Sequence, residues 1–373
     1  MLTFIIFLFT FLTLVYSLKI LFFYYGLFNL KQGTNRQTFS VTILVPARNE
    51  EENIAVCLDS LVRQNYPQNK LQIIVIDDDS EDETAQIVRG YFEKFPYVQL
   101  IHLEKCPPNI SPKKRALQAG IESAESEIIF TTDADCWVDS NWVKKMVTYF
   151  EKDVGMVAGY VSYDAKSETT LFQKMQSLEF LGITSAGIGS IGAGDPIIAN
   201  GANLAFRRRT FFDAGGYKNE NKIISGDDDL LMQKIDRTTS WQIAASTDTD
   251  TFVKTKPMTN LTNFIDQRIR WASKGLVYKK YSLIFFLVSV YLFYLLLFIS
   301  LPFALWFPLY FPYPLYAFAI KLFVDFFLIL KGTSLVRRKD LRKYFLITEM
   351  LQLPYIIYVG FAGIMGTFSW KGR

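Results

Sequence analysis

Three clusters of aspartate lie at intervals along this chain, and a basic and aromatic element follows them. They are Asp77-Asp78-Asp79-Ser80, Asp133-Ala134-Asp135, Gly226-Asp227-Asp228-Asp229 and Gln267-Arg268-Ile269-Arg270-Trp271. Carboxylates at the ends of apolar strands can hold a divalent cation, and that cation can hold a diphosphate. A further carboxylate can accept the proton of an attacking hydroxyl. The clusters therefore indicate transfer of a group from a metal-bound diphosphate to a hydroxyl.

Asp133 and Asp135 form the sharpest of these signals. They follow directly after residues 128–132, an apolar run that is typical of a buried strand. At the bend between a strand and a loop, both carboxylates can converge on one cation and leave positions open for phosphate oxygens. An acid-x-acid triplet is common in itself, and the strand before it is what makes this one informative. We predict a site for Mg²⁺ or Mn²⁺ here.

Helix capping is the alternative explanation for the other two clusters. Aspartate and serine are favoured N-cap residues, and a helix is expected after each cluster. A cap uses one carboxylate, however, whereas three consecutive carboxylates repel one another. We therefore expect Asp77 and Asp78 to bind a ligand. Within residues 227–229, one acid is suited to act as a general base.

The elements that position these clusters are predicted by hydrophobic periodicity. Residues 41–45, 72–76 and 128–132 are typical of buried strands, and residues 50–64 place apolar side chains at helical spacing. Strands that alternate with longer amphipathic stretches predict an α/β fold with a mostly parallel sheet. Ligands bind beyond the carboxyl ends of the strands in such sheets, and the first two clusters lie there.

The composition indicates a membrane protein. Half of the 373 residues are hydrophobic and 16% are aromatic. The apolar segments lie at residues 2–30, 282–310, 314–330 and 344–365. Crossing a bilayer as a helix takes about 20 apolar residues. We expect residues 1–30 to be an N-terminal transmembrane helix, 38–280 a soluble domain and 281–366 a C-terminal transmembrane region of about three helices.

Basic residues set the expected orientation. Lys31 and Arg36 follow the first segment, and the loop 331–343 is rich in lysine and arginine. The positive-inside rule places both on the cytoplasmic side. We therefore expect a multi-pass protein of the inner or plasma membrane with a cytoplasmic soluble domain. Glu349 interrupts the last segment, so a re-entrant or interfacial placement is the alternative there.

Two ionisable residues, Lys321 and Asp325, lie one helical turn apart within the third apolar segment. Ionisable groups inside a membrane are functional candidates. Pairing of the two with each other is the simpler interpretation, and we expect it.

Other residue counts exclude several classes of protein. The net charge of +4 and the lack of a dense basic stripe in the central region argue against a nucleic-acid partner. The cysteines show no close pair, which argues against a disulfide framework and fits a reducing compartment. The single histidine, His102, has no acidic or nucleophilic residue beside it in the sequence. We expect it to have a core or surface role.

Taken together, these motifs resemble the membrane-bound family 2 glycosyltransferases, the branch that includes cellulose, chitin and hyaluronan synthases. The resemblance covers residues 39–275 and implies a GT-A type, nucleotide-sugar-binding domain flanked by transmembrane helices. The residues that would bind the donor nucleotide are Pro46, Asn49, Glu50, Asp77 and Asp78. Asp79 replaces the glycine of the family pattern, so the resemblance leaves the turn geometry open there.

The resemblance also implies the reacting groups. Asp133 and Asp135 would hold the metal, Asp228 would be the general base, and Asp227 would support it. The other substrate-binding residues would be Lys113 and Lys114 near the diphosphate, Asn203 in the acceptor-side segment 200–208, and Gln267, Arg268, Arg270 and Trp271 on a helix at the membrane interface. Alone, that last element would be interpreted as a membrane anchor.

The implied activity is an inverting transfer of a hexosyl or N-acetylhexosaminyl group. The donor would be a nucleoside-diphosphate sugar, foremost a UDP-sugar, and the acceptor a lipid or glycan of the cell envelope. A processive polysaccharide synthase is the alternative, although no gating-loop motif of cellulose synthases follows residue 271. Two further alternatives are a non-catalytic nucleotide-binding membrane module and a metal-dependent phosphohydrolase, which the single histidine disfavours.

Overall fold

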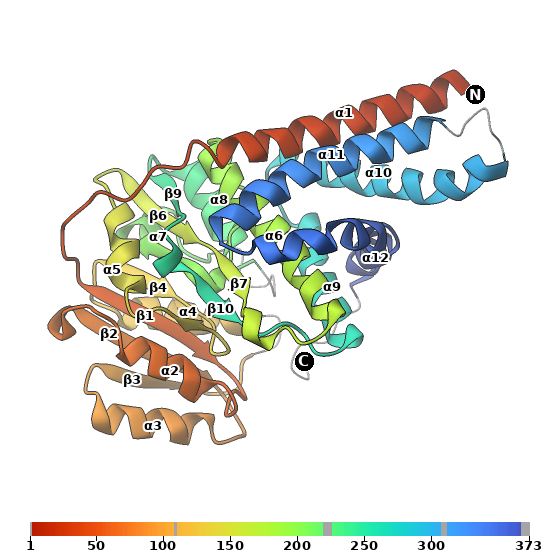
Figure 1. The fold of residues 1–373 in the computed structure, drawn as a ribbon. Coiled ribbons are helices and arrows are strands. Elements are labelled where there is room, and N and C mark those ends of the chain that lie inside the picture. The colour runs from red at the N-terminus through yellow and green to blue at the C-terminus, as the bar shows by residue number, and fades with distance from the viewer. Residues whose placement is uncertain (1, 108–109, 219–225, 307–311, 367–373) are drawn as a thin grey trace. The chain divides into compact units, whose positions relative to one another are not determined.

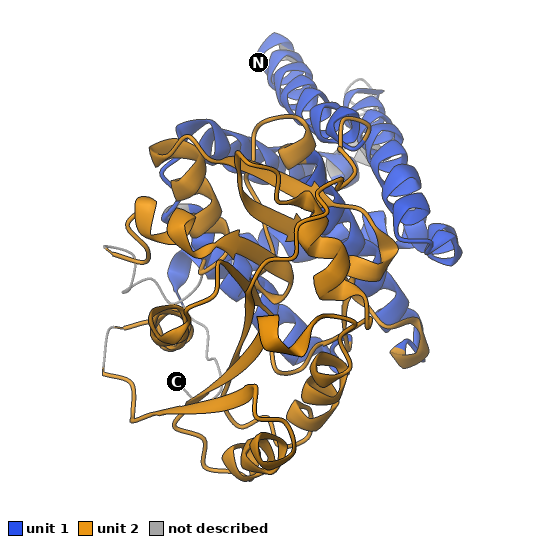
Figure 2. Cartoon of the chain, turned by 90° about the vertical axis from the view of Figure 1, so that its left-hand side faces the viewer, with its two compact units in different colours: residues 1–27, 168–189, 257–373 blue, residues 28–167, 190–256 orange. Residues whose placement is uncertain are grey.

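The computed structural model describes residues 2–107, 110–218, 226–306 and 312–366. It divides into two compact units (Figure 2). The sheet unit contains residues 28–167 and 190–256, and the long-helix unit contains residues 1–27, 168–189 and 257–373. Part of the predicted soluble domain, 168–189 and 257–280, thus groups with the apolar helices. The predicted boundaries between the soluble domain and the transmembrane regions stay a prediction.

The main sheet of the sheet unit is mostly parallel, as predicted (Figure 1). Over the described residues its strand order is β3-β2-β1-β4-β8-β6-β9. The strands are β1 (Val41–Ala47), β2 (Leu71–Asp78), β3 (Val98–Leu103), β4 (Ile128–Thr131), β6 (Val154–Gly159), β8 (Leu204–Arg207) and β9 (Gln242–Ser246). Strand β8 runs antiparallel to both of its neighbours. A smaller sheet of the described chain joins β5 (Trp137–Val138), β10 (Val253–Thr255) and β7 (Val161–Tyr163).

The predicted strands are confirmed, and β1 continues past its expected end through Pro46. The pairing explains how a central strand accepts proline. Strand β4 pairs with β1 only as far as Leu44, whereas β2 continues alongside Pro46. A proline lacks the N–H that a second neighbour would require, so it is tolerated where one neighbour has ended. The sheet therefore opens between β1 and β4 directly before Asp133.

Helices of the sheet unit pack against the sheet, and several begin within or near the acidic and basic motifs of the sequence. They are α2 (Ile54–Val62), α3 (Thr84–Lys94), α4 (Pro112–Ser123), α5 (Trp142–Met146), α7 (Arg208–Asp213) and α8 (Asp229–Thr238). The predicted helix 50–64 begins only at Ile54. The preceding residues form a turn, in which the N–H of Asn53 donates to the carbonyl of Glu50 at 2.9 Å. The backbone N–H of Glu50 donates to the hydroxyl of Thr84, and its carbonyl also accepts from the N–H of Ile54 at the start of the helix.

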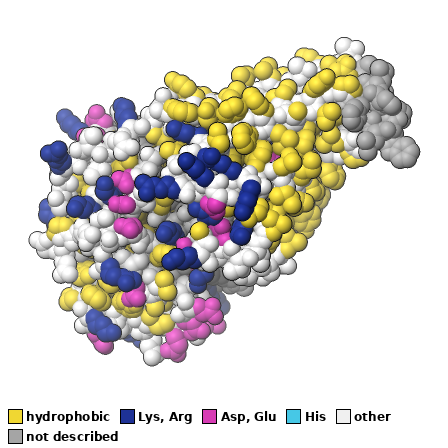
Figure 3. Space-filling view, in the orientation of Figure 1, with side chains coloured by type: hydrophobic (Ala, Val, Ile, Leu, Met, Phe, Trp, Pro, Cys, Tyr) yellow, Lys and Arg dark blue, Asp and Glu magenta, His cyan; other side chains and the backbone are white. Residues whose placement is uncertain are grey.

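The long-helix unit contains α1 (Leu2–Gly26), most of α6 (Leu171–Gly192), α9 (Leu261–Ser273), α10 (Tyr281–Trp306), α11 (Pro312–Leu335) and α12 (Phe345–Met365). In the described part of the chain, four helices are long and apolar enough to cross a membrane: α1, α10, α11 and the segment ending with α12. Hydrophobic side chains are exposed along these helices, as Figure 3 shows. The predicted joint 306–314 lies largely outside the described residues.

Lys321 and Asp325 pair with each other, as predicted. The Nζ atom of Lys321 lies 2.8 Å from Oδ2 of Asp325 and also contacts the carboxylate of Glu349 on α12. The hydroxyl of Tyr16 on α1 donates to Asp325 at 2.8 Å. The lysine side chain is fully buried, and both carboxylates are nearly so. The acid that interrupts the last apolar segment therefore has a partner inside the long-helix unit.

Candidate active site

Asp133 and Asp135 stand just beyond the carboxyl end of β4, where the sheet opens. The end of β4 is fixed by Thr131, whose hydroxyl donates to the carbonyl of Gly201 at 2.6 Å. Ligand atoms of Asp133, Asp135 and the adjacent Cys136 all lie within 4.8 Å of one another. The structure thus brings the two predicted metal ligands together and adds a thiol that was not predicted.

Cys136 supports Asp135 and does not compete with it for a hard cation. Its Sγ lies 3.3 Å from Oδ1 of Asp135, in the position of a donor. Burial, helped by the neighbouring carboxylates, raises the pKa of the Cys136 thiol well above its ordinary value. Mg²⁺ and Mn²⁺ prefer oxygen ligands, so the two carboxylates are the donors that fit such an ion. The thiol holds one of them in position.

Lys113 links two of the acidic clusters. Its Nζ lies 2.8 Å from Oδ1 of Asp133 and 3.1 Å from Oδ2 of Asp227. Burial alone would lower the pKa of Lys113, but the carboxylates of Asp133, Asp227 and Asp228 outweigh it and raise this pKa well above its ordinary value. The side chain is therefore a permanent cation between the predicted metal ligands and the predicted base.

The position of Lys113 follows from how helix α4 begins. Ser111 is the N-cap residue, and its hydroxyl accepts from the N–H of Lys114 at 3.4 Å. Pro112 follows at the first helical position, where its missing N–H costs nothing. The next residue, Lys113, projects from the first turn. Its neighbour Lys114 is only 1% exposed, so the two predicted lysines occupy different environments.

The acids 227–229 divide into three roles. Asp227 faces Lys113. Asp228 caps α8, with Oδ1 accepting from the N–H of Asp229 at 2.7 Å, and its Oδ2 accepts from the N–H of Gly201 at 3.0 Å. Asp229 is 1% exposed and accepts from the N–H of Ala199 at 2.8 Å. Capping thus explains part of the cluster, and Asp228 is the one acid of the three that stays partly exposed.

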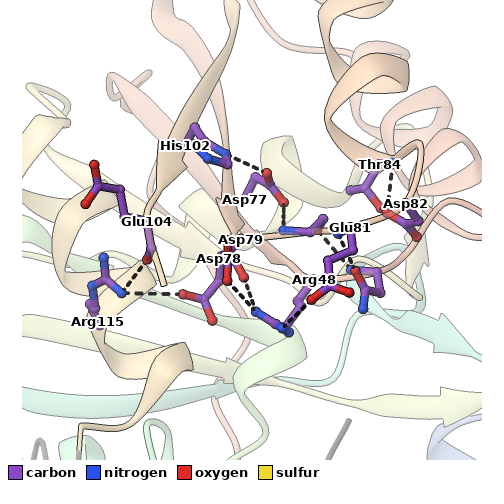
Figure 4. A network of polar contacts seen from close by, with 12 residues as sticks. Arg48, Asp77, Asp78, Asp79, Glu81, Asp82, Thr84, His102, Glu104 and Arg115 are labelled. Carbon is purple, nitrogen blue, oxygen red and sulfur yellow. Dashed lines mark hydrogen bonds and ion pairs between the residues drawn. The ribbon is translucent and has the colours of Figure 1, made fainter. Parts of the chain in front are cut away.

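The cluster at the end of β2 forms a network of polar contacts, drawn in Figure 4. Arg48 donates to the carbonyl of Asp78 at 2.6 Å and lies 3.7 Å from the carboxylate of Asp79. Asp79 has φ +61°, the left-handed conformation that glycine adopts readily. The turn geometry that the substitution for glycine left open is therefore one that glycine could also adopt. Aspartate is among the few other residues that tolerate this conformation.

Asp77 contacts the only histidine of the chain. Its side chain is fully buried, and Oδ2 lies 2.8 Å from Nδ1 of His102, which is 54% exposed (Figure 4). The two residues stand opposite each other in the pairing of β2 with β3. The sequence places no acidic residue beside His102, but the register between β2 and β3 gives it Asp77 as a neighbour. A surface role for this histidine agrees with its exposure.

Asn49 and Glu50 join the loop after β1 to the loop after β2. The N–H of Asn49 donates to the hydroxyl of Ser80 at 3.0 Å, and its side-chain oxygen accepts from the N–H of Glu81 at 2.9 Å. The N–H of Glu50 donates to the hydroxyl of Thr84 at 2.8 Å. The N–H of Thr84 is satisfied by Asp82 rather than by residues 77–79. Capping of α3 therefore does not account for the first acidic cluster.

Asn203 lies in the protein interior. Its amide nitrogen donates to the carbonyls of Tyr160 and Thr251 at 2.7 and 2.8 Å, and its oxygen accepts from Trp142 at 3.0 Å. It anchors the turn Gly201–Asn203, whose backbone contacts Asp228. This supporting role was not predicted.

The predicted acceptor-side segment 200–208 runs along β4 from one end to the other. Strand β8 places Leu204 opposite Thr131 but Arg207 opposite Ile128, at the other end of β4. There the guanidinium of Arg207 pairs with Glu127 and donates to the carbonyl of Val154. Only the first part of the segment therefore lies beside Asp133.

Gln267, Arg268, Arg270 and Trp271 lie on α9, in the long-helix unit. Arg268 is 3% exposed, and its Nε lies 3.1 Å from each carboxylate oxygen of Glu179 on α6. The hydroxyl of Tyr355 on α12 donates to the same glutamate. The guanidinium also stacks 4.3 Å from the ring of Trp271. The structure thus gives Arg268 a buried structural partner, Glu179, that no motif revealed.

Comparison with known proteins places the chain in a family. The model of the glycosyl transferase family 2 matches residues 42–212, and that of the glycosyl transferase family group 2 matches residues 128–331, more than half of the chain. The chain is 29% identical over 209 residues to the probable glycosyltransferase YdaM of Bacillus subtilis (strain 168), covering 52% of this chain and 46% of that protein. It is 25% identical over 259 residues to the poly-beta-1,6-N-acetyl-D-glucosamine synthase of Staphylococcus epidermidis, covering 66% of this chain and 57% of that protein. It thus spans about half the length of these relatives.

A solved structure shares the fold. The mannosyltransferase PcManGT from Pyrobaculum calidifontis, in complex with GDP-Man and Mn²⁺, superposes with a TM-score of 0.57 at 20% identity and covers 94% of this chain and 99% of that chain. Such a similarity concerns architecture, namely a GT-A type domain. The family matches show that this chain belongs to the family 2 glycosyltransferases.

Proposed function

We propose that this chain is an inverting glycosyltransferase that moves a sugar from a nucleoside-diphosphate sugar to a lipid or glycan acceptor at the cytoplasmic face of a membrane. The transferred group is a hexosyl or N-acetylhexosaminyl group, and the donor is foremost a UDP-sugar. The observation that carries the proposal is the gathering of Asp133, Lys113, Asp227 and Asp228 at the open end of β4. Metal ligands, a permanent cation and a candidate base are the groups that this reaction needs.

The donor would bind along the carboxyl ends of β2 and β4. Asp77 and Asp78 would receive the nucleotide, with Asn49, Glu50 and Pro46 closing the same pocket. Asp133 and Asp135 would hold Mg²⁺ or Mn²⁺, which when bound neutralises charge on the diphosphate. Lys113 and Lys114 lie in the first turn of α4, so the positive end of the helix dipole adds to the attraction for phosphate.

The acceptor hydroxyl would attack the anomeric carbon on the face opposite the diphosphate. The new bond joins the acceptor oxygen to that carbon, the carbon–phosphate oxygen bond breaks, and its electron pair leaves with the nucleoside diphosphate. Asp228 would take the hydroxyl proton. Its carboxylate is held by two backbone N–H groups, from Gly201 and Asp229. Asp227, paired with Lys113, would support it.

The resemblance implies further substrate contacts from residues of helix α9. Arg270 would offer charge to the leaving diphosphate, and Trp271 would offer a ring face to a sugar, beside Gln267. The pairing of Arg268 with Glu179 supports a role in holding α9 rather than in touching substrate. Four helices of the described chain that could cross a membrane support a membrane location, with the basic loop 331–343 on the cytoplasmic side.

A processive polysaccharide synthase is the second candidate, and the similarity to a poly-beta-1,6-N-acetyl-D-glucosamine synthase favours it. Mass analysis of the product made by purified protein separates the two. A lipid carrying one or a few sugars supports the first proposal. Soluble product of heterogeneous size supports the synthase.

The deciding experiment measures nucleotide release from a panel of nucleotide sugars with Mg²⁺ or Mn²⁺, using the full chain in detergent or lipid. Asp228→Asn is expected to lower the rate by about 10²-fold or more, as removal of a general base does. Asp153→Asn, at an exposed aspartate of the same unit, is the matched control. The proposal fails if no donor is turned over, or if Asp228→Asn is as active as the parent. Binding of nucleotide without turnover would indicate a non-catalytic module, and cleavage of the donor within its diphosphate a phosphohydrolase.

A further inference from the structure

We infer that Lys113 is an internal counter-cation that pairs with Asp133 until the metal and nucleotide bind, and that it then pairs with the diphosphate. This inference rests on the proposed function and deepens it. The resemblance predicts Lys113 only as a diphosphate contact. Its observed partners are instead two carboxylates from different acidic clusters, Asp133 and Asp227.

The geometry shows that this position is built into the fold. Gly201 borders the contact, and a Cβ atom added there would lie 2.8 Å from Oδ2 of Asp227 and 3.3 Å from Nζ of Lys113. A side chain at residue 201 would therefore push into the pair. The same glycine donates its N–H to Asp228. Backbone, lysine and base thus meet at one position that has no room for a larger residue.

Electrostatics determines what Lys113 does to a metal ion. The ammonium lies 2.8 Å from Oδ1 of Asp133, a predicted metal ligand. A divalent cation at Asp133 must therefore compete with one positive charge and is repelled by it. The side chains of Lys113, Asp133 and Asp227 are 22%, 37% and 10% exposed, so solvent screens this competition only in part.

The diphosphate reverses the effect. When Asp133 is used by the metal, Lys113 loses one carboxylate partner and keeps Asp227. An anionic diphosphate then replaces the lost partner, and Lys113 attracts it. Lys113 should therefore weaken metal binding in the absence of nucleotide and strengthen nucleoside-diphosphate binding in the presence of metal. The two effects have opposite signs, which general damage to the fold cannot produce.

The test measures Mn²⁺ affinity of the full chain in detergent, by the loss of the electron paramagnetic resonance signal of free Mn²⁺. Lys113→Met is expected to bind Mn²⁺ about 3- to 10-fold more tightly than the parent without nucleotide. The same variant should bind UDP with Mn²⁺ about 10-fold more weakly. Lys113→Gln should behave like Lys113→Met, and Lys113→Arg, which keeps the charge, should bind Mn²⁺ like the parent. Lys144→Met, at an exposed lysine of the same unit, is the matched control.

Unchanged or weaker Mn²⁺ binding by both Lys113→Met and Lys113→Gln would overturn the inference. So would tighter binding by Lys113→Arg, because charge would then not be the cause. The Mn²⁺ measurement needs no donor sugar. If the parent turns over no donor, the proposed function fails, and the Mn²⁺ affinities still decide whether Lys113 acts as a counter-cation.

Discussion

Replacement of Lys321 by methionine should destabilise the long-helix unit. Lys321 is fully buried and is shared by the carboxylates of Asp325 and Glu349, on α11 and α12. Removing the lysine leaves two buried carboxylates facing each other. Breaking a buried ion pair on one side costs about 3–5 kcal/mol. The lower end, about 3 kcal/mol, is expected because the hydroxyl of Tyr16 still donates to Asp325.

The assay is thermal unfolding of the full chain in detergent or nanodiscs. A loss of this size should lower the midpoint of the long-helix transition by roughly 5–10 °C. Adding Asp325→Asn and Glu349→Gln to Lys321→Met removes the uncompensated charges, so the triple variant should recover most of the loss. Lys339→Met, at an exposed lysine of the same unit, should unfold with the parent.

Two results would refute the reasoning. If Lys321→Met unfolds at the temperature of the parent, the buried charges do not depend on one another. If the triple variant is less stable than Lys321→Met, the cost came from lost packing or hydrogen bonds and not from unpaired charge. The triple variant thus separates the cost of unpaired buried charge from the cost of lost packing and hydrogen bonds.

Three further outcomes follow from the sheet unit. Asp79→Gly should keep the stability of the parent, whereas Asp79→Val should lose about 1–2 kcal/mol in urea unfolding, because φ there is +61°; equal stability of the two would contradict the strain. His102→Ala should weaken UDP binding by calorimetry about 3-fold and lower stability in urea unfolding by about 1 kcal/mol, because it removes a hydrogen-bond partner from the buried carboxylate of Asp77; unchanged affinity would separate Asp77 from the nucleotide. Gly201→Ala should lower the turnover rate about 10-fold or more with an unchanged circular dichroism spectrum, because the added Cβ would lie 2.8 Å from Oδ2 of Asp227. Full activity would show that the surrounding side chains move to accept the added methyl group.

Much of the fold could be read from local pattern. Strands β1, β2 and β4 are buried apolar runs, and their burial in the sheet is what the runs predicted. Two of the acidic clusters lie at the ends of strands β2 and β4, and parallel strands bring their carboxyl ends to one edge. The position of Asp133 and Asp135 at this edge was therefore predictable. The long apolar helices were predictable for the same reason, since length and hydrophobicity are properties of a segment alone.

The partners of charged residues that lie far apart in the sequence were decided by tertiary structure. Lys113 reaches Asp133 and Asp227, from separate parts of the chain, and Arg268 reaches Glu179 on another helix. Asp77 meets His102 only because of the register between β2 and β3. Burial of an apolar run depends on its own side chains, so periodicity reports it. A salt bridge depends on which segments pack together and in which register, and residues distant in sequence carry no local sign of that. The three acidic clusters therefore predicted a type of chemistry, and only the tertiary structure showed that Lys113 joins two of them.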